Sequence, residues 1–223
     1  MLRAAFAKTL ARLPRRAYYA LSAGLRPYER AHDELPATLP PLSHVHTAGA
    51  QLLPDRRALL AALPNGGTAV ELGVDRGDFS AEILATLQPH VLHLVDSWAS
   101  ARYGEAKRAY VEQRFAGERG RVHLHRADSV TAAGTFGNGS LDLVYVDTVH
   151  DYATTLRELR AYAPKVAEGG ILAGHDYCMG NWARRYRYGV MEAVQVFCVE
   201  DGWRIHYLTA EISERQSFAL ARL

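Results

Sequence analysis

The sequence contains little cysteine and no long apolar run, and both shortages narrow the class of protein. Two cysteines, Cys178 and Cys198, are too few for a disulfide framework and fit a reducing cytoplasm, where we expect the protein to reside. No apolar stretch approaches the roughly 18 residues that a membrane-spanning helix needs. The net charge of +2 gives no strong sign of a nucleic-acid partner, and we predict none.

The basic side chains are concentrated at the N-terminus. The first 30 residues carry seven basic side chains and one acidic one, a net charge of +6, which leaves −4 for the rest of the +2 chain. Their apolar residues have the spacing of an amphipathic helix. We favour a helix that packs on the domain or on a partner subunit of a homodimer. The alternatives are a helix that lies on a membrane surface and an organelle transit peptide.

From Thr68 onward, strand-like and helix-like segments alternate, which is typical of a parallel sheet covered on both faces. We predict strands over residues 68–72, 91–96, 121–127, 141–147 and 170–176, and helices over 55–63, 79–88, 105–117, 152–163 and 190–201. The tail, residues 202–209 and 215–223, predicts an antiparallel hairpin at the sheet edge. The chain is thus divided into a helical extension with a connector, residues 1–65, and an α/β domain, residues 66–223.

The segment from Thr68 to Ser80, TAVELGVDRGDFS, joins a strand to a helix through a glycine-rich turn. Glycine allows positive φ angles and close approach of a ligand, and the first N–H groups of the helix face that ligand. Glu71, Gly73 and Gly77 give the spacing E-x-G-x-x-x-G, without the close G-x-G pair of dinucleotide enzymes. An acid here suits an ammonium group better than a phosphate. We therefore expect S-adenosylmethionine as the cofactor, with Ser80 among its contacts; a purely structural turn is the alternative.

Every predicted parallel strand ends in or near a carboxylate. Because ligands of such sheets bind outside the carboxyl ends of the strands, these acids should surround one crevice. A ring of negative charge there calls for a cationic ligand. The acids are Glu71, Asp96, Asp128, Asp147 and Asp176.

The acids after the second and third strands are candidates for binding the nucleoside. Asp96 can accept two hydrogen bonds from ribose hydroxyls, with Ser97 and Trp98 beside it; an N-cap for the next turn is the alternative. Trp98 either covers the adenine ring or packs in the protein. Asp128 and Ser129 either contact the amino edge of adenine or cap the following helix.

Two His–Asp pairs follow the fourth and fifth strands. DTVHDY contains Asp147 and His150, and GHDY contains His175 and Asp176. A carboxylate and an imidazole at the reactive end of the cofactor can bind a metal, or can orient a substrate and take its proton. Asp147, His175 and Asp176 are the candidate ligands for Mg²⁺ or another divalent ion; a buried hydrogen-bond network is the alternative. The histidines inside strands are expected to be core or sheet-face residues: His93, His123 and His125.

At these residues the chain resembles the class I S-adenosylmethionine-dependent methyltransferases, and most of all the small-molecule group with the macrocin-type and catechol-type O-methyltransferases. The resemblance spans about residues 66–222 and is carried by VELGVDRGDFS, HLVDSW, LDLVYVDTVHDY and GGILAGHDY. It implies a Rossmann-like, doubly wound sheet of seven strands, mostly parallel, with an antiparallel C-terminal strand. It also implies a methionine end lined by Glu71 and Gly73, a ribose held by Asp96, and an adenine near Asp128 and Ser129.

By the same resemblance, Asp147 lies at the methyl-transfer end, and in metal-dependent relatives its counterpart binds the metal together with the acid that matches Asp176. Two positions depart from the family pattern. Those relatives follow the second acid with another acid or an amide, where this chain has Tyr177. A close relative would carry glycine after the first aspartate, where this chain has Thr148.

The sequence therefore predicts a transferase that methylates a hydroxyl of a small molecule, such as a sugar or a natural-product intermediate. His150 or His175 is the predicted base, and Asp147 lies beside the transferred methyl group. The substrate would be selected by residues 1–60 and by the insertion at 178–189. One rival is an NAD-dependent oxidoreductase on the same type of sheet, and another is a non-catalytic protein that binds a membrane surface through residues 1–30.

Overall fold

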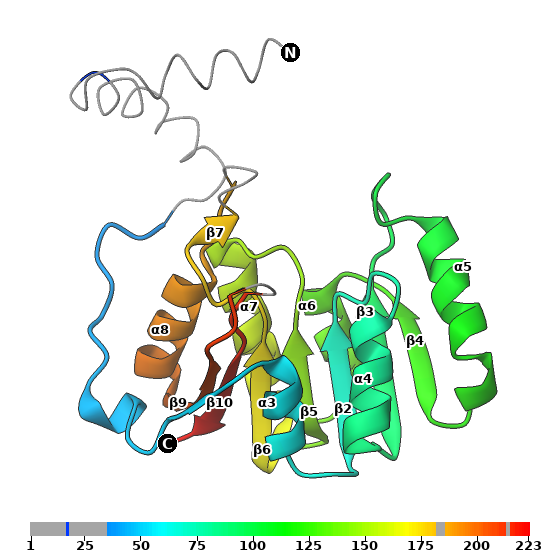
Figure 1. Cartoon of the computed structure of the whole chain (residues 1–223), viewed down its shortest axis with the longest axis horizontal. Coiled ribbons are helices and arrows are strands. Elements are labelled where there is room, and N and C mark those ends of the chain that lie inside the picture. Colours follow the sequence, from blue (N-terminus) through cyan, green and yellow to red (C-terminus); the bar gives the residue numbers. More distant parts are fainter. Residues whose placement is uncertain (1–16, 18–34, 182–185, 213–214) are drawn as a thin grey trace.

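A computed structural model of the protein describes Ala17 and residues 35–181, 186–212 and 215–223. Helices cover both faces of one large β-sheet, so that the domain has three layers (Figure 1). The basic helix predicted over residues 1–30 lies outside the described residues, apart from Ala17.

The main sheet has eight strands, and it confirms the predicted doubly wound α/β fold. The strands are β1 (Gln51–Leu53), β2 (Thr68–Leu72), β3 (Val91–Asp96), β4 (Val122–Arg126), β5 (Leu141–Val146), β6 (Val166–Gly174), β9 (Trp203–Thr209) and β10 (Phe218–Arg222). Their spatial order is β1-β9-β10-β6-β5-β2-β3-β4, and all neighbours are parallel except the two pairs that involve β10. The strand beyond the predicted seven is β1, which is too short to show an alternating pattern.

The C-terminal hairpin does not lie where the sequence predicts it. β9 and β10 are antiparallel neighbours, but β10 lies between β6 and β9, and β1 forms the edge instead. Phe218, Ala219 and Leu220 are at most 1% exposed. A strand that is apolar on both faces is stabilised most when strands and helices cover it on every side, which explains the interior position of β10.

Two sets of helices enclose the sheet. One face carries α3 (Arg56–Ala62), α4 (Asp78–Leu87) and α5 (Glu105–Arg114), and the other carries α6 (Ser129–Ala132), α7 (Tyr152–Tyr162) and α8 (Val190–Asp201). Short 3₁₀ turns are η1 (His44–His46), η2 (Ala116–Glu118), η3 (Ala133–Thr135) and η4 (Ala163–Lys165). Asp55, Asp128 and Asp151 cap α3, α6 and α7 by accepting a backbone N–H. The predicted helices are thus confirmed to within a few residues.

Part of the predicted N-terminal extension belongs to the folded domain. Residues 51–62 supply the edge strand β1 and the helix α3, whose Leu59 and Leu60 are fully buried. The boundary at residue 65 stays a prediction. Within the predicted insertion at 178–189, β7 (Gly180–Asn181) and β8 (Tyr186–Arg187) pair as a small antiparallel hairpin.

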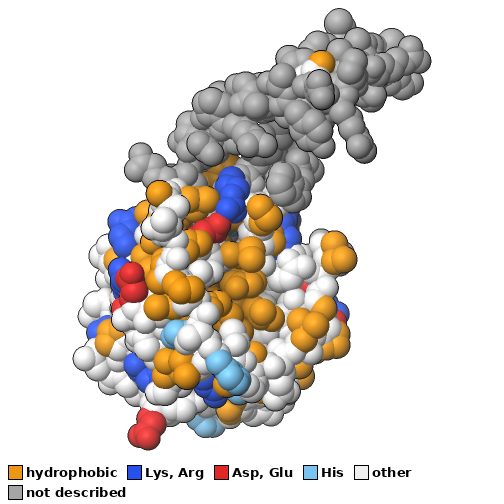
Figure 2. All heavy atoms as spheres, turned by 90° about the vertical axis from the view of Figure 1, so that its left-hand side faces the viewer, with side chains coloured by type: hydrophobic (Ala, Val, Ile, Leu, Met, Phe, Trp, Pro, Cys, Tyr) orange, Lys and Arg blue, Asp and Glu red, His pale blue; other side chains and the backbone are white. Residues whose placement is uncertain are grey.

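The surface gives two further observations. Figure 2 shows the side that lies on the left in Figure 1, and hydrophobic side chains gather near its centre. Exposed large apolar residues include Val45 and Leu52, which precede α3. In the described part of the chain, no helix is both long enough and apolar enough to cross a bilayer. The homodimer and the cytoplasmic location stay predictions.

Candidate active site

The centre of the site is the point where the order of the strands reverses, between β2 and β5. In a doubly wound sheet, ligands bind outside the carboxyl ends of the strands at this point. Gly73 follows β2 with a φ of 88°, and its N–H donates to Val95 O at 2.9 Å. A Cβ on Gly73 would lie 2.0 Å from the carbonyl oxygen of Asp147, the residue that follows β5. Glycine is therefore required for the two strand ends to lie side by side.

The second glycine of the turn also serves the protein's own packing. Gly77 caps α4 in a left-handed conformation with a φ of 73°. A Cβ there would lie 2.7 Å from the ring of Phe115. The glycines thus bring β2, β5 and α5 into close contact, a reason that spacing alone does not reveal.

Glu71 is buried below the turn and hydrogen-bonded. It is 2% exposed, and the hydroxyl of fully buried Ser80 donates to its Oε2. Burial raises the pKa of Glu71 to about 8, although the Ser80 hydrogen bond opposes the shift, and the charge of Asp147 raises the pKa further. Glu71 is therefore largely protonated at neutral pH in this structure.

The carboxylate of Asp96 holds the backbone around it. Its Oδ2 accepts the N–H groups of Val74 at 3.0 Å and Asp75 at 3.1 Å, and its Oδ1 accepts Trp98 N–H at 2.8 Å. Asp96 thus fixes the glycine turn, while neighbouring Ser97 is exposed. Three donors leave part of its acceptor capacity for a ribose hydroxyl.

Trp98 is packed inside the protein. Its side chain is 1% exposed, and its indole N–H donates to Asp75 O at 3.3 Å. Of the two predicted roles, packing describes the observed position. A ring with almost no exposed surface has no face on which adenine could stack.

Asp128 and Ser129 lie at the start of α6. Asp128 is exposed and caps the helix by accepting Thr131 N–H at 3.1 Å. Ser129 donates its hydroxyl to Glu158 of α7. Capping is thus observed, and it leaves the exposed side of Asp128 accessible to a ligand.

Glu158 is a site residue that the sequence did not reveal. It is fully buried, and besides the Ser129 hydroxyl it accepts the Thr148 hydroxyl at 2.9 and 2.8 Å. Burial raises the pKa of Glu158 to about 7, against the effect of both hydroxyl donors. This carboxyl group connects the loop after β4 to the loop after β5. Within the helix pattern it reads as an ordinary charged position, so no signal in the sequence could have found it.

Asp147, His150 and Asp176 meet at the ends of β5 and β6. One potential ligand atom from each lies within 4.8 Å of the others. His150 Nε2 lies 3.1 Å from Asp176 Oδ2. His150 and Asp176 have positive φ angles of 51° and 57°, and such backbone conformations in residues other than glycine are concentrated at functional sites. Arg215, also missed from the sequence, brings its Nε to 3.3 Å from Asp176 Oδ1.

His175 does not join this cluster, and the predicted ligand set of Asp147, His175 and Asp176 is corrected here. Its Nδ1 lies 3.0 Å from Ser217 Oγ, and Tyr145 OH lies 3.2 Å from the same oxygen. β6 ends at Gly174, and the left-handed φ of 57° at Asp176 turns the chain there, so that the side chains of His175 and Asp176 have different partners. His150 occupies the third position of the cluster instead.

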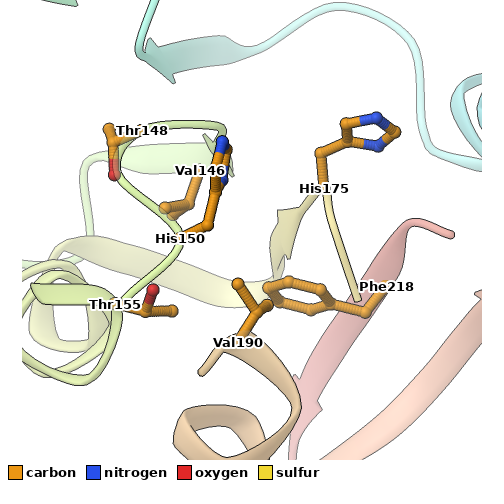
Figure 3. A pocket seen from close by; sticks show the side chains of 7 residues that line it. All are labelled: Val146, Thr148, His150, Thr155, His175, Val190 and Phe218. Atoms are coloured by element: carbon orange, nitrogen blue, oxygen red, sulfur yellow. The ribbon is translucent and has the colours of Figure 1, made fainter. Parts of the chain in front are cut away.

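The two histidines border a small cavity. Figure 3 shows His150 and His175 on different sides of it, with Thr148, Val190 and Phe218 completing much of the lining. Its volume is about 10 Å³, roughly the space that one water molecule requires. A larger cavity of about 240 Å³ lies at the other edge of the sheet, near Gly66 and Asp142 at the starts of β2 and β5. That edge carries none of the predicted site residues.

Crowded charges perturb the ionisation of the cluster. Burial, followed by the charge of Asp176, raises the pKa of Asp147 to about 7, while Arg56 and Arg215 act in the opposite direction. Burial lowers the pKa of His150, although Asp176 opposes this shift. At neutral pH the cluster therefore contains a neutral imidazole beside a carboxyl group that readily gains or loses a proton. Such an arrangement can perform acid–base chemistry.

The sequence match agrees with this geometry. Residues 70–177 match the family model described as a methyltransferase domain, and they contain the strand ends that form the site. The match covers just under half of the chain, so this segment is similar to methyltransferase domains, and the sheet has the Rossmann-like fold of methyltransferases. No curated protein matches the chain.

Solved structures with a similar fold have diverse substrates. An rRNA methylase from Streptococcus thermophilus is 16% identical with a TM-score of 0.54, over 75% of this chain and 94% of that one. Geranyl diphosphate C-methyltransferase from Streptomyces coelicolor, solved with Mg²⁺, geranyl diphosphate and S-adenosylhomocysteine, is 10% identical with a TM-score of 0.56, over 75% and 80%. A protein from Corynebacterium glutamicum is 16% identical with a TM-score of 0.55, over 91% and 97%. Such likeness shows the fold and does not select a substrate.

Proposed function

We propose that this protein transfers a methyl group from S-adenosylmethionine to a hydroxyl of a small molecule, such as a sugar or a natural-product intermediate, with His150 as the base. The observation that supports this most directly is the contact of His150 with Asp176, beside Asp147 at the point where the strand order reverses. An imidazole held by a carboxylate next to the expected position of the methyl group is the arrangement that removal of a hydroxyl proton needs.

The cofactor would lie across the carboxyl ends of β2, β3 and β4. Its ammonium group would face the turn that contains Glu71, Gly73 and Gly77, with Ser80 behind it. Ribose would contact Asp96 near Ser97, and adenine would lie near Asp128 and Ser129. Two observations support this placement. Asp96 fixes the glycine turn by accepting two of its backbone N–H groups, and Asp128 and Ser97 are exposed at the same edge of the sheet.

The reaction would be an in-line displacement. The substrate oxygen forms a bond to the methyl carbon, the bond between that carbon and sulfur breaks, and its electron pair remains on sulfur. The hydroxyl proton passes to His150. If Nε2–H donates to Asp176, then Nδ1 carries the lone pair that accepts this proton. The lowered pKa of His150 favours the neutral form that a base requires. Alignment of oxygen, methyl group and sulfur would supply much of the remaining rate enhancement.

The cluster also fits a divalent metal. Asp147, His150 and Asp176 offer two carboxylates and one imidazole. The buried Oδ1 of Asp176 accepts no hydrogen bond in the described structure and has only the ion pair with Arg215 at 3.3 Å. Mg²⁺ or Mn²⁺ suits carboxylate-rich ligand sets. When bound, such an ion would lower the pKa of the substrate hydroxyl and orient its oxygen. Metal binding through Nε2 would replace the contact of His150 with Asp176.

Calorimetry with S-adenosylmethionine, S-adenosylhomocysteine and NAD tests the cofactor directly. We expect binding of the first two and none of NAD; binding of NAD alone would support the rival oxidoreductase.

Transfer of a labelled methyl group to panels of sugars, phenolic compounds and RNA tests the substrate class. We expect labelled small molecules, and exclusive labelling of RNA would contradict the proposal. Chelation with EDTA during the same assay separates the two roles of His150. Activity that is retained supports His150 as the base, and activity that is lost and then restored by Mg²⁺ supports His150 as a metal ligand.

A further inference from the structure

Three histidines lie on one face of β3 and β4, at the end of the sheet opposite β1 (Figure 1). In the parallel register, His93 lies beside His123, and Val95 lies beside His125. Side chains two residues apart on a strand share a face. His93, His123 and His125 therefore project from the same face, the one that α6 and α7 cover, because Val95 belongs to the core on that side.

The rings are in direct contact. His93 Nδ1 lies 2.9 Å from His125 Nε2. The ring centroid of His93 lies 5.0 Å from that of His125 and 5.5 Å from that of His123. Buried Phe136 contacts the pair, with centroid distances of 5.0 Å to His93 and 5.7 Å to His125. His123 is exposed, whereas His93 and His125 are half-buried.

Burial disfavours the charged forms of His93 and His125. Burial, together with the neighbouring histidines His125 and His123, lowers the pKa of His93 to about 4. Burial, then His123, lowers the pKa of His125. A neutral imidazole is the form that binds a metal ion, and protons therefore compete weakly at this position.

We propose that His93, His123 and His125 form a binding site for Zn²⁺ or a similar divalent transition metal, with water as the fourth ligand. Zinc binds imidazole nitrogen at 2.0–2.1 Å, and sites with three protein ligands keep one position open. Two nitrogens on one tetrahedral ion lie about 3.3 Å apart by the same geometry. The observed 2.9 Å contact needs to open by only a few tenths of an ångström. In the observed orientations the three histidines do not offer nitrogens that all lie within 4.8 Å of one another, so the exposed ring of His123 has to turn toward the ion.

The proton balance is simple. The contact between His93 and His125 uses one N–H and one lone pair. On metal binding, the donor ring keeps its proton but carries it on its other nitrogen, so that both contacting nitrogens bind the ion. The imidazole ligands therefore release no net protons, and any release comes from the zinc-bound water, whose pKa is about 7. Phe136 remains as an apolar floor that favours this arrangement over a hydrated one.

This site differs chemically from the Asp147 cluster, and it does not depend on the proposed methyl transfer. Three imidazoles favour zinc, copper and nickel, whereas two carboxylates with one imidazole favour magnesium and manganese. Coordination number separates the sites as well, because the histidine site predicts four ligands and carboxylate-rich sites take six.

Cobalt reports on this difference. Titration of the metal-free, full-length protein with Co²⁺ should produce the intense visible absorption of a four-coordinate ion at one equivalent. His125→Asn should abolish that absorption. Loss of an outer-shell partner already lowers metal affinity by about 10- to 100-fold, so loss of a ligand should lower Zn²⁺ affinity by about 100-fold or more.

Matched variants make the result decisive. His44→Asn changes an exposed histidine of η1 and should keep the absorption, as should Asp176→Asn in the other cluster. His123→Asn replaces an exposed side chain, so its loss of absorption cannot be attributed to a disturbed core. An intense band that survives in either His125→Asn or His123→Asn would overturn the proposal. Loss of the band in Asp176→Asn, or its absence from the unmodified protein, would do the same.

Discussion

Two parts of the same sheet edge use carboxylates in opposite ways. At the end of β3, Asp96 accepts three backbone N–H groups and fixes the turn of the chain. At the ends of β5 and β6, Asp147 and Asp176 crowd against His150. The pKa of Asp147 is raised, the pKa of His150 is lowered, and His150 and Asp176 have positive φ angles. Asp96 is hydrogen-bonded to the backbone around it, whereas Asp147 and Asp176 lie close to an imidazole and to each other.

This difference in contacts suits the Asp96 part to binding the cofactor and the Asp147 part to the chemical step. A carboxylate that accepts several backbone N–H groups keeps its position, which suits a frame for a cofactor. Burial and the charge of Asp176 raise the pKa of Asp147 to about 7, so that Asp147 can exchange a proton near neutral pH, which suits a reactive end. Glu158 connects the reactive part to the loop after β4, because it accepts hydroxyls from Thr148 on one side and Ser129 on the other.

The largest expected effect concerns the reactive part. His150→Ala should lower turnover by about 10²- to 10⁴-fold, the usual contribution of a positioned acid or base, while affinity for S-adenosylmethionine changes little. Burial lowers the pKa of His150 below its ordinary value of 6.5. Turnover should therefore stay constant as the pH falls to 6.5. It should decrease only at a lower pH, where His150 gains a proton and can no longer act as a base. Steady-state kinetics across pH, with calorimetry of the cofactor, measure both effects.

His175→Ala is the matched control for this prediction. His175 is oriented toward Ser217 rather than toward Asp176, so its loss should slow turnover less than the loss of His150. Full turnover in both variants would remove histidine from the mechanism. A greater loss in His175→Ala would transfer the role of the base to that residue.

The second effect concerns Glu158, which connects the loops after β4 and β5. The pKa of Glu158 is raised from 4.5 to about 7, so the folded protein binds its proton more tightly than the unfolded chain does. This contribution to stability is complete below pH 4.5 and is lost as the pH rises to about 7. Each pKa unit corresponds to about 1.4 kcal/mol, which gives a loss of about 3 kcal/mol over this range.

Glu158→Gln should remove that contribution to the pH dependence. Urea unfolding at pH 5 and pH 7.5 should show that the variant gains stability relative to the unmodified protein as the pH increases. Exposed Glu168 provides a control, because Glu168→Gln should leave the pH dependence unchanged. Parallel pH profiles for the unmodified protein and Glu158→Gln would contradict the account of this buried carboxyl group.

The smallest effect concerns the binding part. Asp96→Asn replaces a carboxylate that accepts three N–H groups with an amide that has a single acceptor oxygen. We expect a loss of about 1–3 kcal/mol in the free energy of unfolding, accompanied by weaker binding of S-adenosylmethionine. Thermal denaturation and calorimetry measure the two losses separately.

Asp142→Asn tests whether the loss of binding is local. Asp142 accepts Thr68 N–H at 2.7 Å at the opposite edge of the sheet. This variant should lower stability without changing cofactor affinity. Equal loss of affinity in Asp96→Asn and Asp142→Asn would mean that Asp96 acts through general stability alone.

Several features of the fold could be predicted because they depend on local pattern. The buried parallel strands are continuous apolar runs, and α8 begins and ends at the predicted residues Val190 and Asp201. Features that depend on partners distant in sequence were missed. β1 is recognisable only through its pairing with β9, and β10 reaches the interior only because β6 and β9 cover both of its edges.

The site divides in the same way. The sequence by itself determined which acids end the strands, because strand ends follow from hydrophobic pattern and turn residues, and it therefore indicated Glu71, Asp96, Asp147 and Asp176. Only the tertiary structure decided that His150, rather than His175, lies beside Asp176. It also decided that Glu158 connects two loops. Side-chain direction and contacts between distant segments arise from packing, which no local pattern encodes.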